Sequence, residues 1–378
     1  MDALRASTML LLVPVHAAAL VSQNGHPGAW ATAVYWLVHV FRLPLFFSMS
    51  GFFFTLLLTR KGLRATARNR TVRIAVPLVL ALLTLVPLSI FLAHQTGTVL
   101  VIHQGVPSGS PFTFEPQFLW FLWYLLIIDC AAIAVYLAAP ALLRRAGGYF
   151  GGLLSRPIGG ILLLALPTVL ALWPERAWTA APAVDTFIPE LPVLAYYTLF
   201  FGLGATLCAH REIVVAAAAN AWRWATCAAG ATLVAAFLFS LHNSAAYGAR
   251  PEIHGVALLI YAIATWSSLI ALVGLANRYM NRPRPALRYM ADASYWIYLS
   301  HMPAVVLLVA LVGATTLGTG PQFVLVTAGA LAASLLTYPL LVRYTAIGRL
   351  LNGRRRRPRR SRTSVSKVSE PVLPGAAG

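Results

Sequence analysis

Ten apolar runs, each close to the length of a membrane-spanning helix, divide this chain of 378 residues. A helix rises 1.5 Å per residue, so about 20 apolar residues cross a hydrocarbon core about 30 Å thick. We therefore predict an all-α integral membrane protein with about ten transmembrane helices. The runs cover residues 4–22, 31–58, 74–93, 119–139, 158–173, 191–208, 222–240, 255–276, 293–313 and 322–342.

The low content of charged residues supports this fold class. Charged residues make up 10% of the chain, against about 25% in soluble proteins. The net charge of +19 would suggest a nucleic-acid partner only if the basic residues shared one folded face. They lie in short blocks between apolar runs, so we predict contact with membrane lipid and no nucleic acid. Cys130, Cys208 and Cys227 lack the spacing of a disulfide framework or a zinc site, and we predict no metal.

The basic residues also predict the orientation in the membrane, because cytoplasmic connections are rich in lysine and arginine. The opposite connections hold only two arginines, Arg176 and Arg250, and they collect five acidic residues: Glu115, Glu175, Asp185, Glu190 and Glu252. With an even number of spans, both termini are therefore predicted to be cytoplasmic. The basic connections contain Arg60, Lys61, Arg64, Arg68, Arg70, Arg73, Arg144, Arg145, Arg156, Arg211, Arg223, Arg278, Arg282, Arg284 and Arg288.

No connection is long enough to form a separate domain. Residues 1–345 are therefore predicted to form one transmembrane domain. Residues 346–378 are basic and rich in Ser and Pro, and they lack apolar periodicity. We predict a disordered cytoplasmic tail there, resting on anionic lipid.

Ionisable residues inside the spans are the first candidates for a functional site, because each is costly in the bilayer. Arg5 and His16 of the first span are separated by eleven positions, which is about 1100° and within about 20° of a whole number of turns. They share one face, with His16 about 16 Å deeper. Two interpretations fit: a functional pair, or an interfacial arginine plus a histidine hydrogen-bonded between helices.

The second span carries His39 and Arg42, three positions apart on one helix face. Arg42 stays protonated, so inside the bilayer it needs a protein partner, water or substrate. A purely structural arginine is the alternative. Pro44 and Gly51 allow an irregular or closely packed helix.

Asp129 lies in the middle of the fourth span and His301 in the ninth. Asp129 has three interpretations: the counter-ion of Arg42, a structural role, or an influence on the protonation of a histidine. His301 is seven residues from Ser294, about 20° from the same face. His301 has two interpretations: a role in the reaction, or a structural role in packing against neighbouring helices.

Five segments occur in order along residues 2–345: LRASTMLLLVPVH, FRLPLFFSMSGFF, RATARNRTVRIAVPL, LWFLWYLL and ASYWIYLSHMP. With them the chain resembles the membrane-bound acyltransferase 3 family, and within it the branch named for glucan biosynthesis protein C. That branch often has a histidine before the Leu-Trp-Phe-Leu run, where this chain has Phe118. This difference leaves the branch, and with it the acceptor, open.

The resemblance implies transfer of an acyl group from cytosolic acyl-CoA to a hydroxyl of a glycan or other cell-envelope acceptor. It implies no permanently bound cofactor and a location in the bacterial inner (plasma) membrane. The family's arginine and histidine of the first span correspond to Arg5 and His16, and its second-span arginine corresponds to Arg42. Its loop arginines, expected to hold coenzyme A, correspond to Arg68, Arg70 and Arg73.

Acyl transfer from a thioester needs a deprotonated nucleophile and a stabilised oxyanion. Our hypothesis makes neutral His16 the general base, with Arg42 near the carbonyl oxygen or near a carboxylate of the acyl group. His39, His301 and Asp129 are candidate helpers, and a covalent acyl-histidine is a variant. The alternative function is a transporter or flippase with a buried Arg/His/Asp pathway, and a non-catalytic scaffold is a third.

Overall fold

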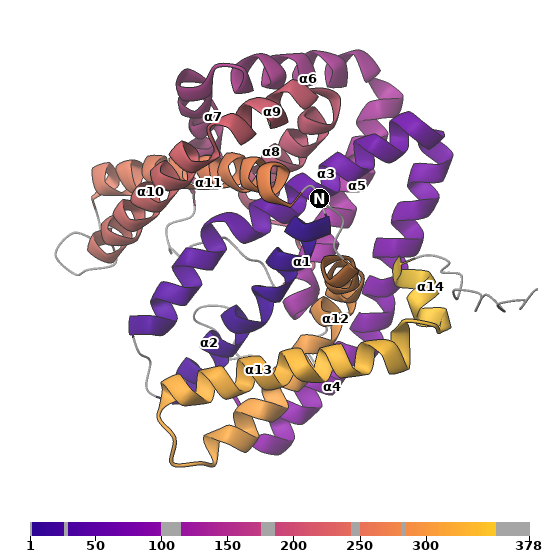
Figure 1. The fold of residues 1–378 in the computed structure, drawn as a ribbon, viewed down its shortest axis with the longest axis vertical. Coiled ribbons are helices and arrows are strands. Elements are labelled where there is room, and N and C mark those ends of the chain that lie inside the picture. The colour runs from indigo at the N-terminus through magenta and orange to yellow at the C-terminus, as the bar shows by residue number, and fades with distance from the viewer. Residues whose placement is uncertain are drawn as a thin grey trace, which may run out of the picture.

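The computed structural model describes residues 2–25, 29–99, 115–174, 186–242, 250–280 and 285–352, and every regular element within them is a helix (Figure 1). The elements are α1 (Asp2–Leu10), α2 (Leu12–Asn24), α3 (Ala29–Arg70), the π-helix η1 (Thr71–Ala75), α4 (Val76–Thr96), the 3₁₀-helix η2 (Gln117–Leu119), α5 (Trp120–Ala138), α6 (Pro140–Leu154), α7 (Pro157–Leu172), α8 (Leu191–Ala209), α9 (Arg211–Ala219), α10 (Ala221–His242), α11 (Pro251–Tyr279), α12 (Pro285–Gly313), α13 (Thr319–Thr337), the π-helix η3 (Tyr338–Val342) and α14 (Ala346–Asn352).

The predicted fold class is confirmed, because 8 helical stretches of the described chain are long and apolar enough to cross a membrane. One of these stretches, Ala33–Thr96, joins α3, η1 and α4 over 64 residues and so contains two of the predicted spans. A shorter apolar helix, Gly159–Leu172, corresponds to the predicted span at 158–173. Each of the ten apolar runs therefore falls within an apolar helix.

The first span is interrupted between Arg5 and His16. Helix α1 ends at Leu10 and α2 begins at Leu12. Pro14 has no amide hydrogen to donate to the carbonyl of Leu10, which removes one helical hydrogen bond at this point. Arg5 therefore lies on α1 and His16 on α2.

The long helix α3 is broken at Gly62, which has φ 78° and ψ 175°. A positive φ of this size is accessible to glycine at little cost, and it allows the chain to turn. In Figure 1 the last part of α3 runs in a different direction from its first part. Arg60 and Lys61 end the first part, whereas Arg70 lies in the second.

Helices α3 and α8 touch through their backbones. A Cβ atom at Gly204 would lie 1.7 Å from the carbonyl oxygen of Ser48, and one at Gly51 would lie 1.9 Å from that of Phe201. Small residues permit such an approach between membrane helices. The predicted close packing near Gly51 is thus confirmed, and it fixes the face of α3 that carries Arg42.

Helix α12 runs parallel to the first span. Arg5 of α1 donates a hydrogen bond from Nη2 to the carbonyl oxygen of Ala291 at 2.8 Å, and the rings of His16 and His301 have centroids 5.0 Å apart. The partners of Arg5 and His16 on α12 are ten positions apart, nearly matching the eleven positions in the first span. Arg5 and His16 therefore both face α12, as the spacing predicted.

The predicted tail begins with an ordered helix. α14 covers residues 346–352, and the side-chain amide of Asn352 donates to the carbonyl oxygen of Asp292 at 2.9 Å. The buried side chain of Leu351 anchors this helix, so the disorder predicted for 346–352 is wrong. Residues 353–378, and the charged residues Arg176, Asp185, Arg282 and Arg284 used to predict the orientation, lie outside the described residues.

The contact between α3 and α8 gives a stability prediction. We expect Gly204→Ala to lower the free energy of unfolding by about 1–3 kcal/mol or more, because the new methyl group would overlap the backbone of α3. Thermal unfolding in detergent measures this loss. Gly202→Ala on the same helix is the matched control, since a Cβ there meets nothing within 4 Å. Equal unfolding temperatures for the two variants would contradict the contact.

Candidate active site

A pair of histidines lies inside the bundle, one from α2 and one from α12. The rings of His16 and His301 have centroids 5.0 Å apart and planes inclined at 45°. His301 is 0% exposed, and its Nδ1 lies 2.7 Å from the carbonyl oxygen of Tyr298. A carbonyl only accepts, so Nδ1 carries the hydrogen and Nε2 is left as an acceptor. Within the described residues Nε2 has no hydrogen-bond partner, and it offers a buried site for a proton.

Aromatic residues enclose His301. The ring of Phe118 meets it edge-on at 5.7 Å, and the ring of Tyr298 lies 6.3 Å away. The hydroxyl of Tyr298 donates to the carbonyl oxygen of Phe118 at 3.1 Å, which ties α12 to η2. Phe118 is the position at which the chain differs from the branch that it resembles. That difference therefore falls in direct contact with the histidine pair, a relationship that spacing along the chain could not reveal.

Arg42 is a second buried polar group, 3% exposed. Its Nη2 lies 3.4 Å from Nε2 of His39, whose Nδ1 lies 3.0 Å from the carbonyl oxygen of Tyr35. His39 therefore donates to the backbone and accepts from Arg42. In the part of the chain that the structure describes, Nε and Nη1 of Arg42 have no hydrogen-bond partner. A buried guanidinium with unused donors is suited to bind an anion or a carbonyl oxygen.

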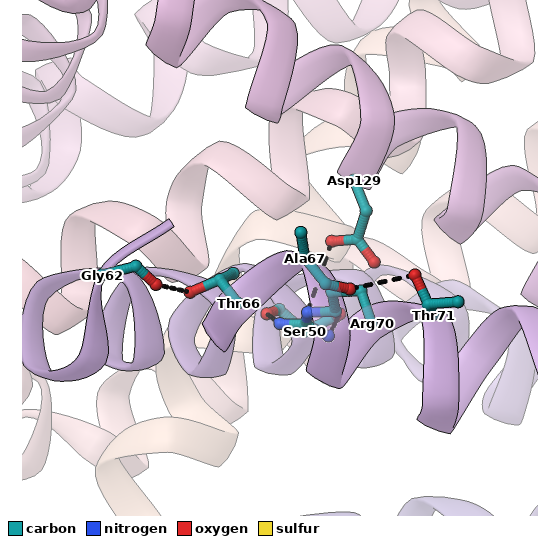
Figure 2. A network of polar contacts seen from close by, with 7 residues as sticks. All are labelled: Ser50, Gly62, Thr66, Ala67, Arg70, Thr71 and Asp129. Carbon is teal, nitrogen blue, oxygen red and sulfur yellow. Dashed lines mark hydrogen bonds and ion pairs between the residues drawn. The ribbon is translucent and has the colours of Figure 1, made fainter. Parts of the chain in front are cut away.

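Asp129 pairs with Arg70, as Figure 2 shows. Nε of Arg70 lies 3.7 Å from Oδ1 of Asp129, which is 1% exposed. The two Nη atoms of Arg70 donate to the hydroxyl and the carbonyl oxygen of Ser50 at 3.0 and 2.9 Å. The interpretation of Asp129 as the counter-ion of Arg42 is therefore wrong, because α5 directs this carboxylate toward the last part of α3.

A cavity of about 530 Å³ opens beside this ion pair. Five cationic residues surround it: Arg5, Arg60, Lys61, Arg70 and Arg73. Its remaining wall is mainly apolar and comes from α1, α3, η1, α5, α12 and α14. The other lining residues are Met9, Phe46, Met49, Ser50, Phe53, Leu56, Leu57, Asn69, Ile74, Phe121, Leu122, Leu125, Ser294, Tyr295, Tyr298, Leu351 and Asn352.

One face of α3 lines the cavity along its length. Phe46, Ser50, Phe53, Leu57 and Arg60 recur at the three- to four-residue spacing of a single helix face. Arg42 is one turn beyond Phe46 on that face. The same helix thus connects the basic rim of the cavity with the buried guanidinium.

Tyr298 connects the cavity with the histidine pair. Its side chain lines the cavity, and its backbone carbonyl holds Nδ1 of His301. On the opposite side Met9 lines the cavity seven residues before His16. Neither histidine lines the cavity, so the link from the cavity to His301 runs through Tyr298.

The loop cations differ in their surroundings. Arg73 donates from Nη2 to the carbonyl oxygen of Asn352 at 3.3 Å, and its own carbonyl accepts from the hydroxyl of Tyr295 at 2.6 Å. Arg68 is exposed and does not line the cavity, whereas Arg60 and Lys61 do. The family motif points to Arg68, whereas Arg60 and Lys61 are singled out only as members of the dense basic block at residues 60–73. The apolar face of α3 that runs into Arg60 and Lys61 was the available signal.

Comparison with protein families identifies the family of this chain. The model of the acyltransferase domain of the acyltransferase 3 family matches residues 1–339. The chain belongs to this family and is a membrane acyltransferase.

Curated relatives cover most of the chain. Glucans biosynthesis protein C of Salmonella paratyphi B is 26% identical over 337 residues, which are 80% of this chain and 81% of the relative. The proteins of the same name from Salmonella dublin and Salmonella enteritidis match to the same extent. No solved structure matches the chain significantly.

The ion pair between Arg70 and Asp129 gives a second stability prediction. We expect Asp129→Ala to destabilise the protein by about 3–5 kcal/mol, because it leaves a buried cation without its carboxylate. The double variant Arg70→Met with Asp129→Leu should lose less than Asp129→Ala, since it removes both charges and retains apolar volume. Unfolding in detergent compares the variants. If Asp129→Ala were as stable as the wild type, the ion pair would contribute nothing to the stability of the protein.

Proposed function

We propose that the protein transfers an acyl group, of acetyl or succinyl type, from cytosolic acyl-CoA to a hydroxyl of a glycan or other cell-envelope acceptor. One observation carries this proposal: a cavity with a basic rim and an apolar wall is lined by Tyr298, whose backbone carbonyl holds the buried His301 beside His16. The names of the curated relatives support a glucan-related acceptor.

The cavity suits the two parts of an acyl-CoA donor. Its phosphates would meet the cations of the rim, where arginine forms charge-assisted hydrogen bonds with phosphate oxygens. Its long thioester arm would lie against the apolar face of α3 and approach Arg42 and the histidines. The basic rim faces the cytosol under the positive-inside rule, and we place the protein in the bacterial inner membrane.

His16 is proposed to act as the general base. In its neutral form it takes the proton of the acceptor hydroxyl while that oxygen attacks the thioester carbonyl. The tetrahedral intermediate then collapses, its carbon–sulfur bond breaks, and the thiolate receives the proton from His16 to leave as coenzyme A. The acceptor-only Nε2 of His301 lies on the neighbouring ring and can stabilise the protonated His16.

Arg42 is proposed to stabilise negative charge on the substrate. Its unused Nε and Nη1 donors can bind the carbonyl oxygen, which becomes an oxyanion during the attack. They can equally bind the free carboxylate of a succinyl group. His39 keeps the guanidinium in place by accepting from its Nη2.

His16→Ala tests the central step. We expect transfer to fall by at least about 100-fold, because the acceptor hydroxyl loses its proposed general base, while the protein stays inserted and folded. Purified protein is given labelled acetyl-CoA or succinyl-CoA with candidate glycans, and mass spectrometry reads the product. His94→Ala, at the exposed end of α4, is the matched control. Normal acylation by His16→Ala would overturn the proposal. Movement of substrate without coenzyme A and without a change in acceptor mass would support a transporter instead.

Arg42→Gln tests the second step. If Arg42 stabilises the oxyanion, the turnover rate falls about 100- to 1,000-fold with acetyl-CoA and succinyl-CoA alike. If it binds the acyl carboxylate, the loss is confined to the succinyl donor. Unchanged rates with both donors would show that Arg42 has a structural role only.

A further inference from the structure

The five cations around the cavity are not equally available to a ligand. Both Nη atoms of Arg70 donate to Ser50, and its Nε lies 3.7 Å from Oδ1 of Asp129, which is an ion pair without a hydrogen bond. Asp129 also neutralises its charge. A phosphate would have to displace these contacts, so Arg70 is a structural clamp between α3 and α5.

Arg5 and Arg73 are partly committed as well. Arg5 donates to the carbonyl oxygen of Ala291 at 2.8 Å, and Arg73 donates to that of Asn352 at 3.3 Å. Both contacts hold helix ends together beside the cavity. These two arginines contribute positive potential to the cavity, but each already donates a hydrogen bond to a backbone carbonyl.

Arg60 and Lys61 are different. Both line the cavity, both are exposed at its rim, and neither forms a hydrogen bond or an ion pair with the rest of the described chain. Gly62 follows directly, and its positive φ ends the helix and turns the chain away from these side chains. An arginine fork next to a flexible ammonium group provides several donors for phosphate oxygens.

We propose that Arg60 and Lys61 bind the phosphates of the coenzyme A donor, whereas Arg70 only holds the wall of the cavity. This inference rests on the proposed function, since it names the residues that recognise its donor. The rival explanation is that Arg60 and Lys61 only set the membrane orientation or complement the end of a helix.

Binding by the purified full-length protein separates the two explanations. Isothermal titration compares coenzyme A with pantetheine, which has the same thiol arm without nucleotide or phosphates. We expect Arg60→Ala with Lys61→Ala to weaken coenzyme A binding by about 10-fold or more and to leave pantetheine binding unchanged. The charge-retaining exchange Arg60→Lys with Lys61→Arg should bind coenzyme A nearly as the wild type does.

Arg144→Ala with Arg145→Ala is the matched control, because it removes two adjacent exposed cations from α6 that do not line the cavity. Two results would overturn the inference and still leave acyl-CoA as the proposed donor. One is an unchanged coenzyme A affinity in the Arg60/Lys61 variant, and the other is an equal loss of affinity in the Arg144/Arg145 variant. A wild-type protein that binds no coenzyme A would overturn the donor itself, and this inference with it.

Discussion

Positive charge held away from water is the constraint on which this bundle depends. An arginine inside an apolar protein must find acceptors, and the two deeply placed arginines do so in different ways. Arg70 donates two hydrogen bonds to Ser50 and forms an ion pair with the carboxylate of Asp129. Among the residues that the structure describes, Arg42 has a weak contact with His39 while its Nε and Nη1 have no partner, so part of its hydrogen-bonding capacity is left for a ligand. The first residue stabilises the wall of the cavity, and the second prepares the site beyond it.

Backbone contacts determine where these charges lie. Gly51 and Gly204 let α3 approach α8 so closely that the helix cannot rotate, which directs one face of α3 along the cavity. Pro14 interrupts the first span between Arg5 and His16, yet both side chains still reach α12. Glycine and proline thus set the depth and direction of the polar groups without contacting any substrate.

The sequence predicted the features that depend on local periodicity. Apolar runs located the helices because lipid cannot satisfy an exposed backbone, and the spacing of Arg5 and His16 predicted a shared face. Contacts between distant helices were beyond such reasoning. Nothing in the sequence indicates that Asp129 forms its ion pair with Arg70. Nor does it indicate that the ring of His301 lies beside the rings of His16 and Phe118. The short helix α14 was missed because seven residues carry too little periodic signal.

The position of α14 has a practical consequence for labelling. Asn352 accepts from Arg73 and itself donates to Asp292, so α14 ends at the wall of the cavity. Arg5 lies near the same place, next to Ala291. A bulky label attached to the side chain of Asn352 or Arg5 would therefore crowd the cavity. The connection between α12 and α13, at the opposite end of the helices, is the better place for a reporter.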